Sequence, residues 1–219
     1  MTDPRSQARP AVSQPGGLPH PVPPRHVHEH QLIHQMDSVD ALLRATSDPS
    51  HRRILANFRR HVLLEVAGRH EEILTPEMTV EHPVYRLVEG RANVVLSGTR
   101  EVLRFYEETS RARANVLWTT GLRPAVADWG FAAEGDFHRQ LPGRFLGEEH
   151  IGVDDPQATY LVSCRAAFIW PYDPEGRLEG EHVYEDPGTV TVTRMLPHEV
   201  ISQPRAAQLL NPLIDSGPR

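Results

Sequence analysis

The order of the hydrophobic patterns is the feature that most limits the fold of this chain. Apolar residues recur at helical spacing between Asp48 and Gly68 and again after Thr99, and strand-like segments follow after Gly121. A parallel sheet with crossover helices would instead require strands and helices to alternate along the chain. The order therefore predicts an α+β fold in which several antiparallel strands follow the main helices.

The two main helices have recognisable starts. Asp48 is a good N-cap, Pro49 suits the first helical position, and the apolar stripe that follows ends near Gly68. Thr99 can cap the start of the second helix. His61 borders the first stripe, so we expect it at the edge of the core, as a packing residue or a pocket residue.

Composition divides the chain into three parts. Residues 1–36 are rich in proline and histidine and poor in large apolar residues, so we expect a disordered arm. Its four histidines in HVHEHQLIH could ligate a metal, but a flexible polar run is the preferred interpretation because distant ligand partners are not evident. Residues 37–197 are predicted to form the domain, and residues 198–219 an irregular tail with a short apolar patch.

Charge and composition exclude several classes of protein. A net charge of −6 argues against nucleic acid as a partner, since a phosphate-binding surface is basic. No apolar run approaches the ~20 residues that span a bilayer, and no secretory signal is visible. The single cysteine, Cys164, cannot form an intramolecular disulfide, which favours a cytoplasmic location, and its apolar strand position predicts an inert packing thiol.

The segment LTPEMTVEHPVYRLVEG places a titratable residue where a core residue is expected. Met78, Val80 and Val84 share one strand parity, and His82 lies on it. Alternate residues of a strand point to opposite faces, so His82 is predicted to face inward. Such a histidine is either a packed core residue or part of a pocket.

A later strand repeats this pattern. In RLEGEHVYED, Leu178 shares its parity with His182, Tyr184 and Asp186, whereas the other parity is mostly charged and is expected to be solvated. Buried polar groups are costly unless they find a partner, and an apolar pocket with a few convergent polar groups relieves that cost. The convergence indicates a functional pocket, although a satisfied internal hydrogen-bond network remains an alternative.

Taken in order, these motifs resemble the nuclear transport factor 2-like (NTF2-like) superfamily, and within it the SnoaL-like and ketosteroid-isomerase-like branch. The matching features are His82-Pro83, Gly98 with Phe105-Tyr106, and Gly176-Arg177-Leu178 with Tyr184 and Asp186. The resemblance covers about residues 48–195. It implies a cone-shaped, curved antiparallel sheet wrapped around the N-terminal helices, with a pocket at the wide end.

The resemblance also implies a pocket enzyme without metal or organic cofactor. Ketosteroid isomerases of this branch have a proton-shuttling aspartate where this chain has His82, and imidazole is an adequate base at neutral pH. Their oxyanion-donating tyrosine corresponds to Phe58 or His61 here, so steroid isomerisation is not carried over. The expected catalytic residues are His82, His182, Tyr184 and Asp186. The expected substrate-binding residues are His61, Tyr85, Tyr106, Trp129, Asp136, His138 and Trp170.

The expected function is acid–base isomerisation, cyclisation or dehydration of a small hydrophobic molecule that bears a carbonyl group. The alternative is a non-catalytic ligand-binding module or a dimeric assembly module with the same fold. The proline-rich arm would then be an interaction segment. A homodimer through the sheet face is expected, because Leu161, Ala167 and Ile169 supply apolar area on the second face of the strand TYLVSCRAAFIW.

Overall fold

The structure is a computed structural model that describes residues 23–89, 92–146 and 153–217. Its helices are α1 (Val27–His34), α2 (Asp37–Ala45), α3 (Pro49–Ala67), α4 (His70–Ile73), α5 (Thr99–Ala112) and α6 (Gln203–Asp215). Its strands are β1 (Val84–Glu89), β2 (Ala92–Ser97), β3 (Leu117–Ala127), β4 (Gly130–Pro142), β5 (Thr159–Pro171), β6 (His182–Glu185) and β7 (Thr191–Arg194). Short 3₁₀ turns occupy Gly143–Phe145 and Pro187–Thr189. Within the described ranges, no helix combines the length and apolar character needed to span a bilayer.

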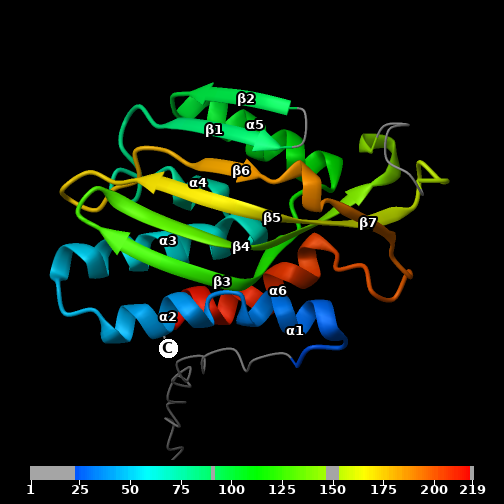
Figure 1. The fold of residues 1–219 in the computed structure, drawn as a ribbon, viewed down its shortest axis with the longest axis horizontal. Helices are drawn as coiled ribbons and strands as arrows, with labels where there is room; N and C mark the ends of the chain where they lie inside the picture. The colour runs from blue at the N-terminus through cyan, green and yellow to red at the C-terminus, as the bar shows by residue number, and fades with distance from the viewer. Residues whose placement is uncertain (1–22, 90–91, 147–152, 218–219) are drawn as a thin grey trace, which may run out of the picture.

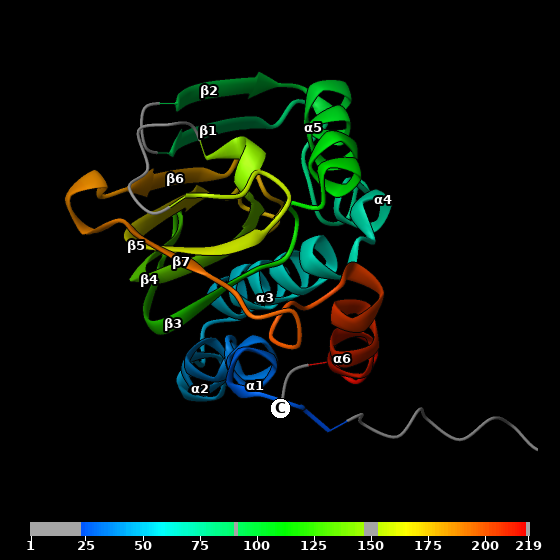
Figure 2. The ribbon, with the colours of Figure 1, turned by 90° about the vertical axis from the view of Figure 1, so that its right-hand side faces the viewer.

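The described strands form one sheet in the order β2-β1-β6-β5-β4-β3, with β7 paired to β5 (Figure 1). Neighbouring strands are antiparallel except β1 and β6, which run parallel. Between Thr120 and Arg123 the β3–β4 register shifts, and such an irregularity bends and twists a sheet. The sheet is curved and open, with α3, α4 and α5 on one side of it (Figure 2). The predicted α+β fold, with a curved sheet around N-terminal helices, is confirmed.

Local sequence explains the bounds of α3, the central helix. The Asp48 carboxylate accepts hydrogen bonds from the backbone N–H groups of Ser50 and His51, at 2.8 and 3.0 Å, and Pro49 follows it directly. The helix ends at Gly68, whose φ of 76° is the left-handed conformation that favours glycine. Both predicted ends are therefore confirmed.

Both ends of the described chain are more ordered than the sequence predicts. Residues 27–34, expected to lie in a disordered arm, form α1, while residues 1–22 lie outside the described residues. Residues 203–215, expected to be irregular, form α6. A buried ion pair joins these two helices, because Arg205 donates to both carboxylate oxygens of Glu29 at 2.8 and 2.7 Å. A bidentate pair of this kind fixes two segments that local sequence alone leaves undecided.

The inner face of the sheet differs from the prediction at β6. Glu181, Val183 and Glu185 are buried against the helices, whereas Tyr184 is 41% exposed and Asp186 is exposed. Tyr184 and the residues that alternate with it were predicted to face inward, and the charged residues between them were predicted to face solvent. Both predictions are wrong. Glu181 lines a cavity on the inner side of the sheet, and Glu185 forms a buried ion pair with Arg139, so the charged alternate residues face inward.

Candidate active site

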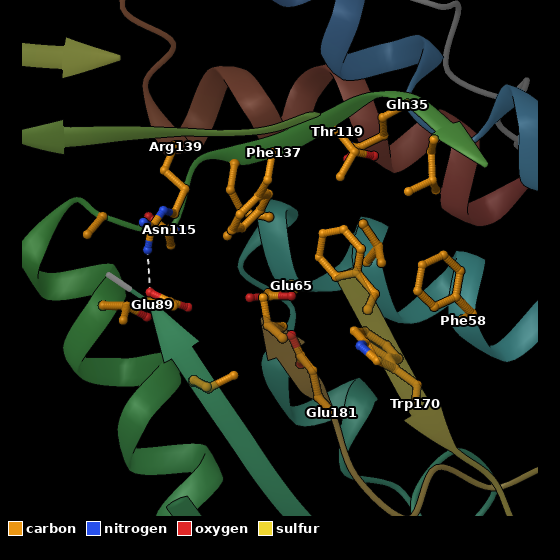
Figure 3. Close-up of a pocket in the computed structure, with 18 of the residues that line it drawn as sticks. Gln35, Phe58, Glu65, Glu89, Asn115, Thr119, Phe137, Arg139, Trp170 and Glu181 are labelled. Atoms are coloured by element: carbon orange, nitrogen blue, oxygen red, sulfur yellow. Dashed lines mark hydrogen bonds and ion pairs between the residues drawn. The ribbon is translucent and has the colours of Figure 1, made fainter. Parts of the chain in front are cut away.

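A cavity of about 170 Å³ lies between α3, α5 and the inner face of the sheet (Figure 3). Its wall is mostly apolar and aromatic and includes Phe58, Val62, Leu87, Phe105, Leu122, Phe137, Phe168, Trp170 and Val183. Its polar lining consists of Gln35, Glu65, Glu89, Thr109, Asn115, Thr119, Arg139 and Glu181. An apolar cavity with a small set of polar groups is the usual form of a small-molecule site.

Two glutamates from distant parts of the chain meet in this cavity. Glu65 lies on α3, seven residues after Phe58, and therefore on the same helix face. Glu181 directly precedes β6, where its backbone carbonyl accepts a hydrogen bond from the Arg86 N–H at 2.8 Å, and its side chain points inward. One carboxylate oxygen of each glutamate and one ring nitrogen of His61 lie within 4.8 Å of one another. Figure 3 shows both carboxyl groups at the same part of the cavity.

The electrostatic environment favours a proton on this pair. Burial raises the pKa of the Glu65 carboxyl, and the negative charge of Glu89 raises it further. Burial likewise raises the pKa of Glu181 well above its usual value, with Glu65 and Glu89 adding to the effect. Two neighbouring carboxyls in an apolar site resist simultaneous ionisation, so the loss of one proton leaves a carboxylate beside a carboxyl that keeps its own proton. The pair can therefore offer one acid and one base at the same time.

A single arginine compensates the other acidic groups of the cavity. Arg139, on β4, forms ion pairs with Glu89 and with Glu185, the latter at 2.6 Å. Its guanidinium is thus shared between two carboxylates. Across the residues that the structure describes, no arginine forms an ion pair with Glu65 or Glu181. Protonation, favoured by burial and by the neighbouring carboxylates, reduces their charge instead.

A buried hydrogen-bond chain adjoins Glu181. His61 Nε2 lies 3.0 Å from the Tyr106 hydroxyl, which donates to the Tyr85 hydroxyl at 3.2 Å. Burial lowers the pKa of His61 to about 3, and raises the pKa values of Tyr85 and Tyr106 well above normal, so all three groups are neutral. His61 Nε2 also lies 3.7 Å from a Glu181 oxygen. The chain thus holds neutral donors beside the carboxyl pair.

The same three residues, His61, Glu65 and Glu181, have a spacing that could serve a metal ion. However, the Tyr106 hydroxyl donates to Tyr85, so its oxygen accepts the proton of His61 Nε2. A nitrogen that carries a proton has no lone pair for a metal. The arrangement therefore fits proton sharing better than metal ligation through this nitrogen.

The structure brings four of the predicted site residues together. His61, Tyr85 and Tyr106 form the hydrogen-bond chain, and the Trp170 ring centroid lies 4.7 Å from that of His61. Trp170 also lines the cavity. These four residues were expected to bind substrate, and they are placed within or directly behind the cavity wall.

The other predicted residues lie elsewhere. His82 is exposed and precedes β1, so the expectation that it faces the cavity is wrong. His182 and Tyr184 lie on the outer face of β6 because that strand has the opposite parity to the one expected. The remaining residues are also outside the cavity, namely Asp186 as the cap of a 3₁₀ turn, Trp129 in the β3–β4 turn, and Asp136 and His138 on the outer face of β4.

Outer-face hydrogen bonds account for the polar residues of β4. Asp136 pairs with Arg165 at 3.0 Å, and His138 contacts the hydroxyls of Thr120 and Ser163 at 2.8 and 2.7 Å. Cys164, in contrast, is buried, and burial raises its pKa to about 12, which agrees with the predicted inert thiol.

Glu65 and Glu181 were missed by sequence reasoning, although each carries a signal. Glu65 continues the helical stripe of Phe58 and Val62, where a charged residue is unexpected. Glu181 shares the parity of Val183, the single apolar residue within an otherwise acidic row. A charged residue within a buried stripe was the informative feature in both cases.

Comparison with known proteins supports the fold. No protein-family model matches the chain, and no curated protein matches it. A protein from Shewanella putrefaciens assigned as a SnoaL-like polyketide cyclase is similar in structure, with a TM-score of 0.50 and 16% identity over 69% of this chain and 90% of that one. A LinA-type dehydrochlorinase from Novosphingobium barchaimii matches with a TM-score of 0.45 and 15% identity, over 72% of this chain and 95% of that one.

An NTF2-like protein from Anabaena variabilis also matches, with a TM-score of 0.44 and 13% identity over 64% of this chain and 93% of that one. At these identities the likeness concerns the fold and leaves the chemistry to the site itself. With a TM-score of 0.50, the Shewanella protein is similar to this chain in fold. The chain therefore has an NTF2-like fold of the SnoaL-like kind.

Proposed function

We propose that the protein is an acid–base enzyme that acts on a small hydrophobic, carbonyl-bearing molecule, with Glu65 and Glu181 as its proton-transferring pair. The observation that carries the proposal is the meeting of these two carboxyls in an apolar cavity, with raised pKa values and without a pairing cation among the described residues. Groups perturbed in this way gather at catalytic sites.

The pair can transfer protons in a simple sequence. The charged carboxylate removes a proton from the carbon next to the substrate carbonyl, and the protonated carboxyl donates to the carbonyl oxygen. The resulting enol returns its O–H proton to the second carboxylate as it reacts onward. In isomerisation it takes the abstracted proton back at another carbon; in cyclisation its carbon adds to a second carbonyl of the same molecule, whose oxygen takes that proton; in dehydration a β-hydroxyl leaves with that proton as water. All three reactions therefore begin from the same step. The Tyr106 and Tyr85 hydroxyls and His61 remain neutral beside Glu181, which keeps its surroundings fixed during the transfer.

The cavity wall defines the class of substrate. Phe58, Phe137, Phe168 and Trp170 present aromatic surface around the carboxyl pair, so a flat apolar molecule would be bound and water excluded. Exclusion of water also strengthens each electrostatic interaction with the developing charge. The proposal requires no metal or organic cofactor.

Deuterium exchange tests the first step without knowledge of the natural reaction. Purified protein is incubated in heavy water with acetophenone and with host small-molecule extract, and exchange of the protons next to each carbonyl is followed by NMR. We expect the wild type to accelerate exchange, and Glu65→Gln and Glu181→Gln to lower the rate by about 100-fold or more. The exposed Glu77→Gln is the matched control, because it makes the same substitution outside the cavity.

Two outcomes would contradict the proposal. Equal exchange by wild type and both variants would show that the pair does not transfer protons. Retention of a compound by the wild type without exchange or conversion would instead support a ligand-binding module. His82→Ala is expected to retain full turnover, since His82 is exposed outside the cavity.

The outer face of the sheet favours a homodimer, which we propose as the assembly state of either function. Ile169 on β5 and Tyr184 on β6 are 36% and 41% exposed, and Ala167 lies opposite Tyr184 in the strand register. Apolar and aromatic side chains on an exposed sheet face are typical of an interface. Light scattering should give twice the chain mass, and Ile169→Glu should give a monomer; a monomeric wild type would contradict the dimer.

A further inference from the structure

A second pocket, of about 440 Å³, lies beside the cavity where α5 ends and α6 begins. Its lining consists of Ser110, Arg111, Arg113, Asn115, Val116, Gln140, Pro142, Arg144, Gln157, Thr159, Val200, Ile201, Ser202 and Gln203. Three of these residues are arginines, and none of the described lining residues is acidic. The pocket is thus locally basic in a chain whose net charge is −6.

The arginines come from two neighbouring segments. Arg111 and Arg113 lie at the end of α5, and Arg144 lies in the 3₁₀ turn after β4. Arg144 Nη2 donates to the Ala112 carbonyl at 3.1 Å, which ties that turn to the helix end. Arg111 has an exposed ion pair with Glu107 at 2.9 Å, and such surface pairs are weak. The three arginines line the pocket, with Arg144 held in place by its hydrogen bond to Ala112 and by the Phe145 ring, whose centroid lies 4.6 Å from its guanidinium carbon.

The start of α6 adds a further positive element. Ser202 is its N-cap, and its hydroxyl accepts a hydrogen bond from the Arg205 N–H at 3.3 Å. Gln203 is the first residue of this 13-residue helix, and both Ser202 and Gln203 line the pocket. The N-terminus of a helix of this length carries partial positive charge and favours anions.

A buried donor between the two pockets indicates that a ligand reaches both. Asn115 is 4% exposed, lines the cavity and the basic pocket, and its Nδ2 has no hydrogen-bond partner. The Ser110 hydroxyl, which also lines the basic pocket, is buried and without a partner as well. Unpaired buried donors are costly, and an acceptor oxygen of a ligand would satisfy them.

We propose that the basic pocket binds an oxyanion, a phosphate or a carboxylate, carried by the molecule whose apolar part occupies the cavity. The pocket supplies what an oxyanion needs, namely guanidinium donors, a helix N-terminus and neutral amide and hydroxyl donors. The assignment of the anion to the substrate rests on the proposed function, whereas binding of the anion by the pocket does not.

Calorimetric titration with inorganic phosphate and, separately, with acetate tests the pocket. We expect millimolar or tighter binding of at least one anion, weakened by added sodium chloride because the arginines are partly exposed. Arg113→Gln should weaken binding about ten-fold. Arg104→Gln is the matched control, since Arg104 is an exposed arginine of the same helix outside the pocket and should bind as the wild type does. The tighter of the two anions identifies the group.

Arg113→Gly separates a binding role from a structural one. Arg113 has a φ of 60°, a left-handed conformation that glycine adopts more easily. The glycine variant is therefore expected to unfold at higher temperature than the wild type while it loses about ten-fold in anion affinity. Loss of stability without loss of affinity would overturn the proposal, as would binding of neither anion at millimolar concentration.

Phenyl phosphate and benzoate, each compared with phenol, test the link to the cavity. Both pockets acting together should bind one of these aromatic anions at least ten-fold more tightly than phenol or the inorganic anion. Equal affinity for the aromatic and inorganic anions would show that the basic pocket binds anions independently of the cavity, and would overturn the proposal that one molecule occupies both. Glu65→Gln should retain phosphate binding. The anion-binding proposal can therefore fail or hold independently of the catalytic proposal.

Discussion

Replacing Glu65 with glutamine should remove much of the pH dependence of stability near neutral pH. In the folded protein, burial and the charge of Glu89 raise the pKa of Glu65 from its ordinary 4.5 to about 8. The folded state therefore binds the proton more tightly than the unfolded chain. The stabilising contribution is complete below the unfolded value and is lost as the pH rises towards the folded value.

The size of the effect follows from the shift. Each unit of pKa change corresponds to about 1.4 kcal/mol, but Glu65 and Glu181 influence each other's titration, so the change is divided between them. The free energy of unfolding of the wild type should therefore fall by roughly 2–4 kcal/mol between about pH 5 and pH 8. For a domain of this size, that fall lowers the melting temperature by about 5–15 °C.

Urea denaturation followed by circular dichroism at a series of pH values measures this dependence directly. Glu65→Gln should flatten the decline above pH 5, because glutamine has no proton to lose. Glu77→Gln, at an exposed position, should retain the wild-type profile. A wild type whose stability is constant or rises between pH 5 and pH 8 would show that the carboxyl pair does not hold a proton in the folded state.

Three further predictions concern other buried polar groups. Burial lowers the pKa of His61 to about 3, so the wild type should lose stability as the pH falls below 6.5, and His61→Gln should reduce that acid loss in the same urea titrations. The Thr119 hydroxyl is buried and unpaired, so Thr119→Val should raise the free energy of unfolding by about 1 kcal/mol, and a decrease would contradict this reasoning. Glu29→Gln should cost about 3 kcal/mol because it leaves buried Arg205 without its charged partner, whereas Glu107→Gln, in an exposed pair, should cost under about 1 kcal/mol in chemical denaturation.

Local chemistry made the helical part of the fold predictable. The bounds of α3 depend on Asp48, Pro49 and Gly68, which act within one turn of their own positions. The start of α5 was placed less well: Thr99, expected to cap this helix, is its first residue, and Gly98 holds the cap position without a side-chain hydrogen bond. The order of helices and strands then limits the topology, so the α+β class followed from pattern alone, whereas the curved sheet was implied by the family resemblance.

The two terminal helices were harder to predict from the sequence, because contacts between residues far apart in the chain stabilise them. α1 is almost without amphipathic pattern, and its fixed position depends on the ion pair between Glu29 and Arg205, 176 residues apart in the chain. α6 contains Pro212 in its interior, which argues against a helix locally, yet Leu209, Leu210 and Leu213 are all buried against the core. Tertiary packing outweighed the local preference in both cases.

The catalytic residues expected on β6 were wrong because the acidic face of that strand was assumed to be solvated. That assumption is sound for isolated residues, because a buried carboxylate is costly. It failed at Glu181 and Glu185 because other elements change the cost of burial: Arg139 from β4 pairs with Glu185, and burial together with the charge of Glu65 from α3 raises the pKa of Glu181 and so favours its neutral form. Neither partner lies within fifteen residues of β6, so no local pattern reveals the pairing.

The distribution of charge over the cavity and the basic pocket favours one orientation of a ligand that occupies both. Acidic groups line the cavity around Glu65 and Glu181, and arginines line the adjoining pocket, with Asn115 between them. In the proposed binding mode, Arg113 and Arg144 hold an oxyanion at one end of the molecule, and its uncharged end lies in the cavity. That orientation brings a carbonyl group, and not the anion, to the two glutamates, which is the arrangement that proton transfer requires.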